Sequence, residues 1–131
     1  MLTNIPGYPR IGSQRELKKA CESYWAGKIS LERLELTARQ LRKENWRFLQ
    51  EAGISLIPSN DFSWYDQVLD MCLLLGVIPA RFRALQQTLA NPACLELYFA
   101  MARGYQKNNF DITALEMTKW FDTNYHYLVP E

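Results

Sequence analysis

The sequence predicts an α/β fold, the opening part of a (β/α)8 TIM-like barrel with about three parallel strands and several helices. Short apolar stretches alternate with helical patterns in the order strand, two helices, strand, several helices, strand. Strands separated by helices need crossover connections, which build parallel sheets. Polar residues also follow the strand candidates: Arg10 after the first, Ser59 to Asp61 after the second, and the polar tail with the third. The carboxyl ends of parallel strands form the active face of such folds, so these residues indicate one.

The composition suits one ordinary domain over residues 1–131, with 48% hydrophobic residues to supply a core. The 15 Lys and Arg residues nearly balance the 14 Asp and Glu residues, so the chain lacks the basic excess of a nucleic-acid-binding domain. The longest apolar stretch, MCLLLGVIPA, contains Gly76 and Pro79 and is shorter than the ~18 residues that a membrane span needs. We therefore expect neither nucleic acid nor a membrane as a partner.

The cysteines and the N-terminus both favour a cytoplasmic protein. The opening residues, MLTNIPGYPR, lack a charged region followed by an apolar one, so no secretory signal is visible. The chain has three cysteines, an odd number, and they are widely spaced: Cys21, Cys72 and Cys94. Each lies in a helical apolar pattern. This pattern favours buried free thiols in a reducing compartment.

The first predicted elements are a strand over residues 3–8 and a helix over residues 14–26. Pro6 weakens the strand because it cannot donate to a central ladder. Ser13 and Glu16 have the spacing of a capping box, and Gly27 ends the helix. The apolar stripe of this helix is Leu17, Ala20, Cys21 and Tyr24.

A second helix is predicted from Ser30, a good N-cap, to Ala52, with Gly53 as its C-terminal stop. Its inner face is Leu31, Leu34, Ala38, Leu41, Asn45 and Phe48 or Leu49. Residues 54–57 form a short apolar run between Gly53 and a proline, which is typical of a buried parallel strand.

The second half of the sequence predicts three more helices and a final strand region. Ser63 is the expected cap of a helix over residues 64–75, with Asp66 at the box position, and another helix covers residues 80–90. Asn91 and Pro92 should start a further helix that runs to about Ala102. Residues 105–113 are expected to form a polar loop. The aromatic tail from residue 114 suits a strand that is interrupted at residues 122–124.

The basic residues near the start of the first helix leave two interpretations open. Arg15 and Lys18 lie about 60° apart there at 3.6 residues per turn, beside unpaired backbone N–H groups, and could bind a carboxylate or phosphate together with Arg10. Alternatively they form a solvated basic face, with Lys18 paired to Glu22 one turn later. Spacing alone favours the solvated face.

The tail offers two further candidates and no recognisable catalytic motif. Lys119, between aromatic residues on a proposed strand, either extends from an edge or points into a pocket. His126 is the only histidine, and a packed or hydrogen-bonded side chain is the favoured interpretation. It has no cysteine or second histidine at ligand spacing, so we expect no zinc site within the chain.

Four long blocks resemble the N-terminal region of the cobalamin-independent methionine synthases: GYPRIGSQRELKKACESYWAGKIS, LIPSNDFSWYDQVLDM, LYFAMARG and EMTKWFDTNYHYLVPE. The resemblance implies a polypeptide of two (β/α)8 barrels, of which this chain is the opening part. It also implies transfer of a methyl group from 5-methyltetrahydropteroyltri-L-glutamate to homocysteine, giving methionine. The RELK motif and the lysine of MTKWF would help to hold the polyglutamate tail. The implied folate-binding residues are Arg15, Glu16, Leu17, Lys18 and Lys119, with Asn124 as a weaker candidate.

The resemblance implies a zinc ion in the C-terminal barrel, where it would hold homocysteine as a thiolate. Those ligands would lie outside this chain. By the same resemblance we expect the chain to hold no catalytic residue, to be inactive alone and to have the C-terminal barrel as a partner. Two alternatives remain: a standalone anion-binding or interaction module, and a corrinoid or related methyltransferase on the same barrel. Open edge strands of an incomplete barrel also predict self-association.

Overall fold

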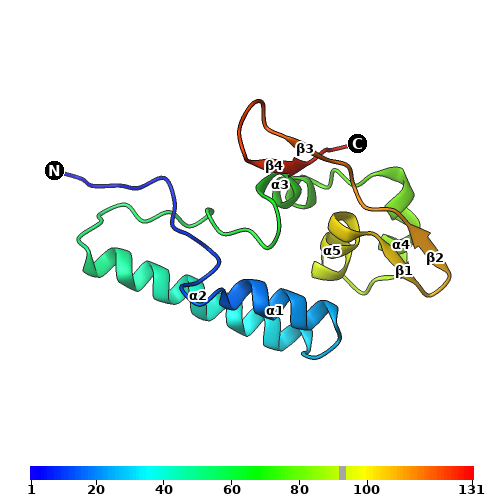
Figure 1. Cartoon of the computed structure of the whole chain (residues 1–131), viewed down its shortest axis with the longest axis horizontal. Coiled ribbons are helices and arrows are strands. Elements are labelled where there is room, and N and C mark those ends of the chain that lie inside the picture. Colours follow the sequence, from blue (N-terminus) through cyan, green and yellow to red (C-terminus); the bar gives the residue numbers. More distant parts are fainter. Residues whose placement is uncertain (92–93) are drawn as a thin grey trace. The chain divides into compact units, whose positions relative to one another are not determined.

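The computed structural model describes residues 1–91 and 94–131 and divides the chain into two compact units. The N-terminal unit is Met1–Phe62, and the C-terminal unit is Ser63–Glu131. Helices form most of the regular structure in both units, and all the described strands lie in the second (Figure 1).

Two antiparallel helices form the N-terminal unit: α1 (Glu16–Trp25) and α2 (Leu31–Glu51) lie side by side (Figure 1). The predicted apolar stripes meet between them. The buried residues are Leu17 and Cys21 of α1 and Leu34, Ala38, Leu41 and Leu49 of α2. The helical periodicity therefore identified the buried residues, with Leu49 and not the 54% exposed Phe48 as the last of them. The other residues of the predicted stripes are half-buried: Ala20, Tyr24, Leu31 and Asn45.

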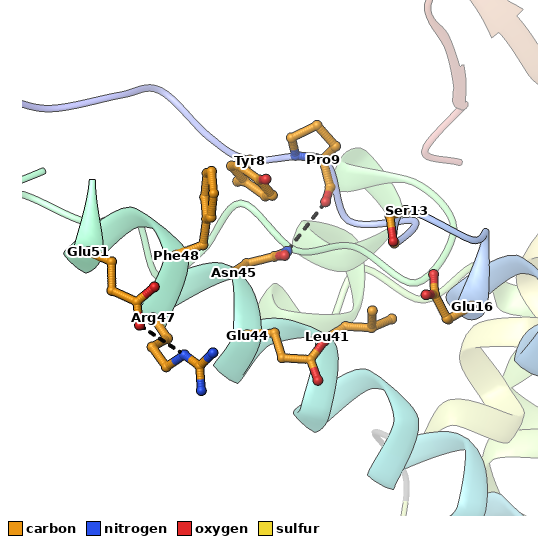
Figure 2. A pocket seen from close by; sticks show the side chains of 11 residues that line it. Tyr8, Pro9, Ser13, Glu16, Leu41, Glu44, Asn45, Arg47, Phe48 and Glu51 are labelled. Atoms are coloured by element: carbon orange, nitrogen blue, oxygen red, sulfur yellow. Dashed lines mark hydrogen bonds and ion pairs between the residues drawn. The ribbon is translucent and has the colours of Figure 1, made fainter. Parts of the chain in front are cut away.

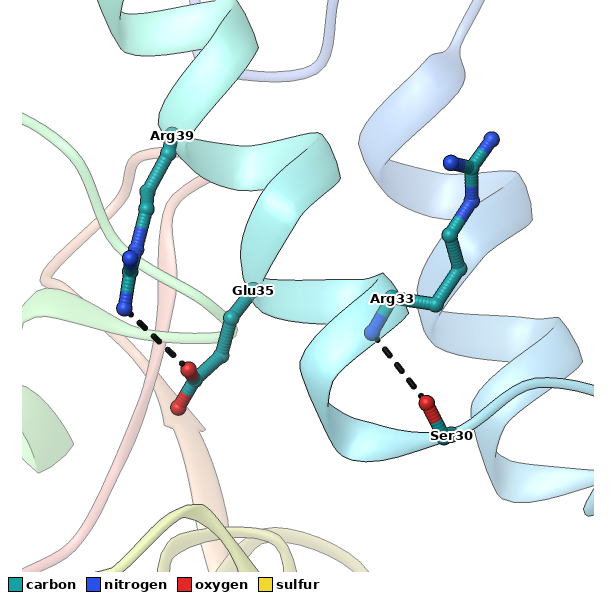
Figure 3. A network of polar contacts seen from close by, with 4 residues as sticks. All are labelled: Ser30, Arg33, Glu35 and Arg39. Atoms are coloured by element: carbon teal, nitrogen blue, oxygen red, sulfur yellow. Dashed lines mark hydrogen bonds and ion pairs between the residues drawn. The ribbon is translucent and has the colours of Figure 1, made fainter.

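Helix α2 begins and ends as its sequence predicts. The Ser30 side chain accepts a hydrogen bond from the Arg33 backbone N–H at 3.3 Å (Figure 3). On the exposed face, Arg39 pairs with Glu35 one turn earlier at 3.4 Å. Gly53 follows the helix at φ +80°, a conformation that glycine adopts without a side-chain penalty.

Helix α1 begins differently from the prediction, because Arg15 and not Ser13 is its N-cap. Arg15 has the left-handed conformation, with φ 60° and ψ 36°, and no side chain caps the helix. Its N–H donates to the Gly12 carbonyl at 3.1 Å, which closes a tight turn. Glu16 accepts from the Gln14 N–H at 3.0 Å and not from the Ser13 N–H, so the predicted capping box does not form.

The two parallel strands predicted in the N-terminal unit do not form. Residues 3–8 and 54–57 share only an isolated parallel bridge, between Asn4 and Leu56. Thr3 supports this contact by accepting from the Ser55 and Leu56 N–H groups. Leu56 is 53% exposed, so the apolar run does not have the burial that the strand prediction required.

The C-terminal unit contains α3 (Gln67–Leu75), the 3₁₀ helix η1 (Ala80–Phe82), α4 (Arg83–Thr88) and α5 (Leu95–Arg103). The cap of α3 is Asp66, not Ser63, because the Asp66 carboxylate accepts from the Leu69 N–H at 3.0 Å. Helix α5 starts after Cys94 rather than at Asn91, and Pro92 lies outside the described residues. The core of this unit includes Leu69, Cys72, Phe82, Leu85, Leu97, Tyr98, Met101, Ile112, Leu115 and Leu128.

Two antiparallel hairpins complete this unit. Strands β1 (Tyr105–Lys107) and β2 (Phe110–Ile112) pair where a loop was predicted, joined by Asn108 and Asn109 at φ 52° and 63°. Strands β3 (Met117–Lys119) and β4 (His126–Leu128) form the second hairpin, interrupted where the sequence indicated. Its two strands pair with each other and with no parallel neighbour in the part of the chain that the structure describes.

These pairings contradict the predicted fold class. Residues 1–91 and 94–131 contain five α-helices and two small antiparallel sheets, with no parallel ladder and no partial (β/α)8 barrel. The predicted active face at the ends of parallel strands is therefore wrong as well. Among the same residues, no helix is long and apolar enough to cross a membrane.

Candidate functional site

The first group of predicted site residues surrounds the start of α1 in the N-terminal unit. Arg15 and Lys18 are exposed there, whereas Leu17 is 1% exposed and its N–H donates to the Ile11 carbonyl at 3.0 Å. Lys18 Nζ lies 3.8 Å from Glu22 Oε1, with both side chains more than half exposed. The pairing that supported a solvated face thus exists, but an exposed pair of this kind contributes little and can open for a ligand.

Glu16 has a structural role in the same turn. Its carboxylate accepts from the Gln14 N–H and lies so close to Gly12 that a Cβ there would overlap it. Gly12 has φ +87°, which also favours glycine. The RELK motif therefore presents Arg15 and Lys18 to solvent, while Glu16 and Leu17 hold the turn and the helix in place.

Arg10, the third basic residue considered for this site, has a different environment. It is half-buried and lines a small cavity with Arg42 and Asp61. Asp61 accepts from the Tyr8 N–H at 2.8 Å and so fixes the turn that carries Arg10. We assign Arg10 to this internal cluster rather than to the exposed start of α1.

A groove of about 460 Å³ lies between residues 8–16 and α2, and sequence reasoning did not find it. Figure 2 shows the Tyr8 and Phe48 rings at one end, with their centroids 5.6 Å apart. The Asn45 amide donates to the Pro9 carbonyl at 3.3 Å across the groove (Figure 2). Asn45 on the inner face of α2 was the one available signal, since an amide there needs a polar partner.

The groove has an excess of negative charge, which disfavours an anionic ligand. Its charged lining, in the described part of the chain, is Glu16, Glu44, Glu51 and Arg47. Arg47 Nε already pairs with Glu51 Oε1 at 3.2 Å (Figure 2). A carboxylate would meet excess negative charge in the groove, so the exposed cations at the start of α1 offer the better anion surface.

The second group of predicted site residues lies on the β3–β4 hairpin of the C-terminal unit. Lys119 on β3 stands opposite His126 on β4, and both side chains are exposed. Asn124 is exposed in the connecting loop, and its carbonyl contacts His126 Nδ1 at 3.1 Å. The hairpin therefore presents one cation and one amide to solvent at its turn.

The hairpin loop also exposes apolar side chains. Trp120 is 49% exposed and Phe121 is 79% exposed, with ring centroids 5.1 Å apart. The Trp120 N–H donates to the Tyr125 carbonyl at 2.8 Å, and Phe121 has φ 48° in the turn between them.

The predicted site residues are divided between the two compact units. Arg15 and Lys18 belong to the N-terminal unit, and Lys119 and Asn124 belong to the C-terminal unit.

Nothing among residues 1–91 and 94–131 gathers three or more His, Cys, Asp or Glu side chains in a form that could hold a metal ion. The three cysteines are free thiols: Cys21 and Cys72 are buried as predicted, whereas Cys94 is half-buried. Burial raises the pKa of the Cys72 thiol, and the nearby Asp66 carboxylate adds to this. Cys72 is consequently a poor nucleophile at neutral pH.

Comparison with known proteins matches residues 2–131 to the family model described as "Cobalamin-independent synthase, N-terminal domain". The chain is 60% identical over 131 residues to a 5-methyltetrahydropteroyltriglutamate–homocysteine methyltransferase of Cytophaga hutchinsonii. It is 61% identical over 131 residues to one of Flavobacterium johnsoniae. These matches cover 100% of this chain but 17% and 16% of the relatives' lengths. The chain belongs to the N-terminal domain family of the cobalamin-independent methionine synthases.

Proposed function

We propose that residues 1–131 are the opening part of the N-terminal domain of a methyltransferase that methylates homocysteine from 5-methyltetrahydropteroyltri-L-glutamate. In this proposal the segment binds the polyglutamate tail of the folate and supplies none of the reacting groups. The relatives' names, which specify a triglutamate folate and homocysteine, support the substrate class. The remaining part of a two-domain polypeptide is the proposed partner.

The observation that carries the proposal is the start of α1. Arg15 is an N-cap without a side-chain acceptor, and Lys18 follows within the first turn. The Arg15 N–H donates to the Gly12 carbonyl and the Leu17 N–H donates to the Ile11 carbonyl, so the attraction for a carboxylate comes from the positive end of the helix dipole and from the two basic side chains. Arg15 can bind a carboxylate with two parallel hydrogen bonds, and Lys18 adds a point charge.

We propose that Lys119 and Asn124 of the C-terminal unit also bind carboxylates of the tail. A γ-linked triglutamate has several carboxylates spaced along a flexible chain, so it can use cations on separate elements. Lys119 is exposed on β3 and offers one ammonium group, while the Asn124 amide can donate to a further oxygen. Binding of this kind is mainly electrostatic and should weaken with salt.

We propose that the zinc ion of the whole enzyme, which would hold the homocysteine sulfur as a thiolate, is bound outside this chain. The isolated chain is therefore proposed to bind the folate tail without catalysing methyl transfer.

The test compares alanine variants of the proposed cations with a matched control. Lys18→Ala and Lys119→Ala should each weaken folate triglutamate binding about tenfold, because each removes a charge-assisted hydrogen bond. Lys43→Ala removes an exposed lysine from α2 and should leave the affinity unchanged. Isothermal titration calorimetry measures the triglutamate affinity of the wild type and the three variants. If Lys43→Ala loses as much affinity as the other two, the effect comes from net charge alone, and the assignment of Lys18 and Lys119 to the tail is overturned.

A second candidate function is self-association, which the exposed side chains of the hairpin loop favour. Met117, Trp120, Phe121 and Tyr125 are each more than 40% exposed, an unusual concentration of large apolar groups on one short element. Size-exclusion chromatography with light scattering should then give a dimer that Phe121→Ser returns to a monomer. A monomeric wild-type chain at high concentration would exclude this candidate.

A further inference from the structure

Asp66 forms more hydrogen bonds than a helix cap requires. It is only 5% exposed, and Oδ2 accepts from the Leu69 N–H at 3.0 Å, which is the capping contact. The same oxygen accepts from the Leu128 N–H at 3.1 Å, and Oδ1 accepts from the Tyr125 hydroxyl at 2.7 Å. Two of the three donors therefore belong to the β3–β4 hairpin, about sixty residues later in the chain.

The pairing of β3 and β4 explains why the Leu128 N–H needs this carboxylate. The Trp120 N–H donates to the Tyr125 carbonyl, and the Val129 N–H donates to the Glu116 carbonyl. Hydrogen-bonded pairs alternate in an antiparallel ladder, so the Leu128 N–H, opposite Met117, points away from β3. Leu128 is 1% exposed, and without an acceptor its N–H would be a buried unsatisfied donor.

Asp66 is itself fixed from the opposite side by Tyr98 of α5. The Tyr98 hydroxyl accepts from the Tyr65 N–H at 2.9 Å and from the Asp66 N–H at 3.1 Å. Tyr98 is 1% exposed, so this anchor is part of the core of the C-terminal unit. A continuous set of contacts thus runs from α5 through Asp66 to the hairpin that carries Lys119.

We propose that Asp66 is a positioning residue which, through the Tyr125 hydroxyl and the Leu128 N–H, holds the β3–β4 hairpin so that Lys119 and Asn124 meet the folate tail. This inference rests on the function proposed above. A two-stranded hairpin is marginally stable alone, so its geometry depends on such contacts. Tyr125 lies at the end of the loop next to Asn124, where a lost contact would disturb the site most directly.

Tyr125→Phe is the principal test because it removes one hydroxyl from a side chain that is 44% exposed. Tyr105→Phe is the matched control. Tyr105 lies on β1 of the other hairpin, and its hydroxyl donates to the exposed Glu96 carboxylate of α5. Asp66→Ser is a second variant: serine caps helices well but is too short to keep both hairpin contacts. It separates the capping role of Asp66 from the positioning role.

Two measurements are made on each protein: titration with tri- and monoglutamate folate, and hydrogen exchange of the Trp120 amide. Tyr125→Phe should weaken triglutamate binding about fivefold, leave monoglutamate binding unchanged and speed Trp120 exchange, because the competent hairpin conformation is less populated. Asp66→Ser should do the same more strongly, and Tyr105→Phe should match wild type. If Tyr125→Phe leaves Trp120 exchange unchanged, or speeds it without changing the triglutamate affinity, the inference about Asp66 is overturned and the proposed function still stands. A wild-type protein that binds both folates equally would overturn the proposed function, and the inference with it.

Discussion

Replacing Gly12 with alanine should destabilise the N-terminal unit more than any other glycine substitution near α1. Gly12 has φ +87°, and an alanine there costs about 1–2 kcal/mol in backbone strain. The new Cβ would also overlap Glu16 Oε2 and lie 3.0 Å from Leu41 Cδ2. Glu16 must move and lose its bond to the Gln14 N–H, worth about 1 kcal/mol. The expected total is therefore about 2–3 kcal/mol.

Gly27→Ala is the control that separates strain from overlap. Gly27 has φ +68°, and nothing lies within 4 Å of a Cβ built on it. It should cost only the backbone strain of about 1–2 kcal/mol. Hydrogen exchange of the buried Ala38 and Leu41 amides in α2 gives the free energy of opening for each variant. Equal losses for the two variants would refute the role assigned to the Gly12–Glu16 contact.

Three further predictions concern caps, thiols and alkaline pH. Ser30→Ala should cost about 1 kcal/mol in urea unfolding, because it removes the cap of α2, and no loss would contradict the observed cap. Iodoacetamide at pH 8 should modify the half-buried Cys94 before Cys72, whose pKa is raised by burial, as mass spectrometry would show. Burial also raises the pKa of Tyr98 above its ordinary value, so the unfolded state loses this proton first as pH rises. Above pH ~10 the free energy of unfolding of the wild type should therefore fall by up to ~1.4 kcal/mol per pH unit more than that of Tyr98→Phe, which lacks this proton.

The sequence predicted the helices well where local signals were complete. Helix α2 has a side-chain cap at Ser30, a glycine stop at Gly53 and a long apolar stripe, and its observed bounds match the prediction within a residue. The start of α1 was misplaced because the Ser13–Glu16 spacing satisfied the capping-box pattern. The decisive feature was the left-handed Arg15, which no residue preference would indicate.

The strands were predicted less well, because strand pairing depends on contacts distant in sequence. Residues 54–57 have the composition of a buried strand, yet their only pairing is one bridge to Asn4. The β1–β2 hairpin had a usable signal: Asn108 and Asn109 tolerate positive φ and form a two-residue turn. The tail was correctly identified as extended, but composition does not reveal that β3 pairs with β4 antiparallel.

The site residues were predicted from the resemblance, and the structure adds what spacing could not supply. It separates the exposed Arg15 and Lys18 from Glu16 and Leu17, which support the turn and the core. The three-way contact of Asp66 could not be predicted, since it joins residues about sixty positions apart. The sequence indicated Asp66 only at the box position of a helix that Ser63 was expected to cap.

The proposed recognition of the folate polyglutamate tail is tested by the ratio of the dissociation constants for mono- and triglutamate 5-methyltetrahydrofolate, measured by titration at low and high salt. We expect at least about tenfold tighter triglutamate binding at low salt, and a smaller difference at high salt because salt screens the charges. Equal affinity for the two folates at low salt would contradict the proposal.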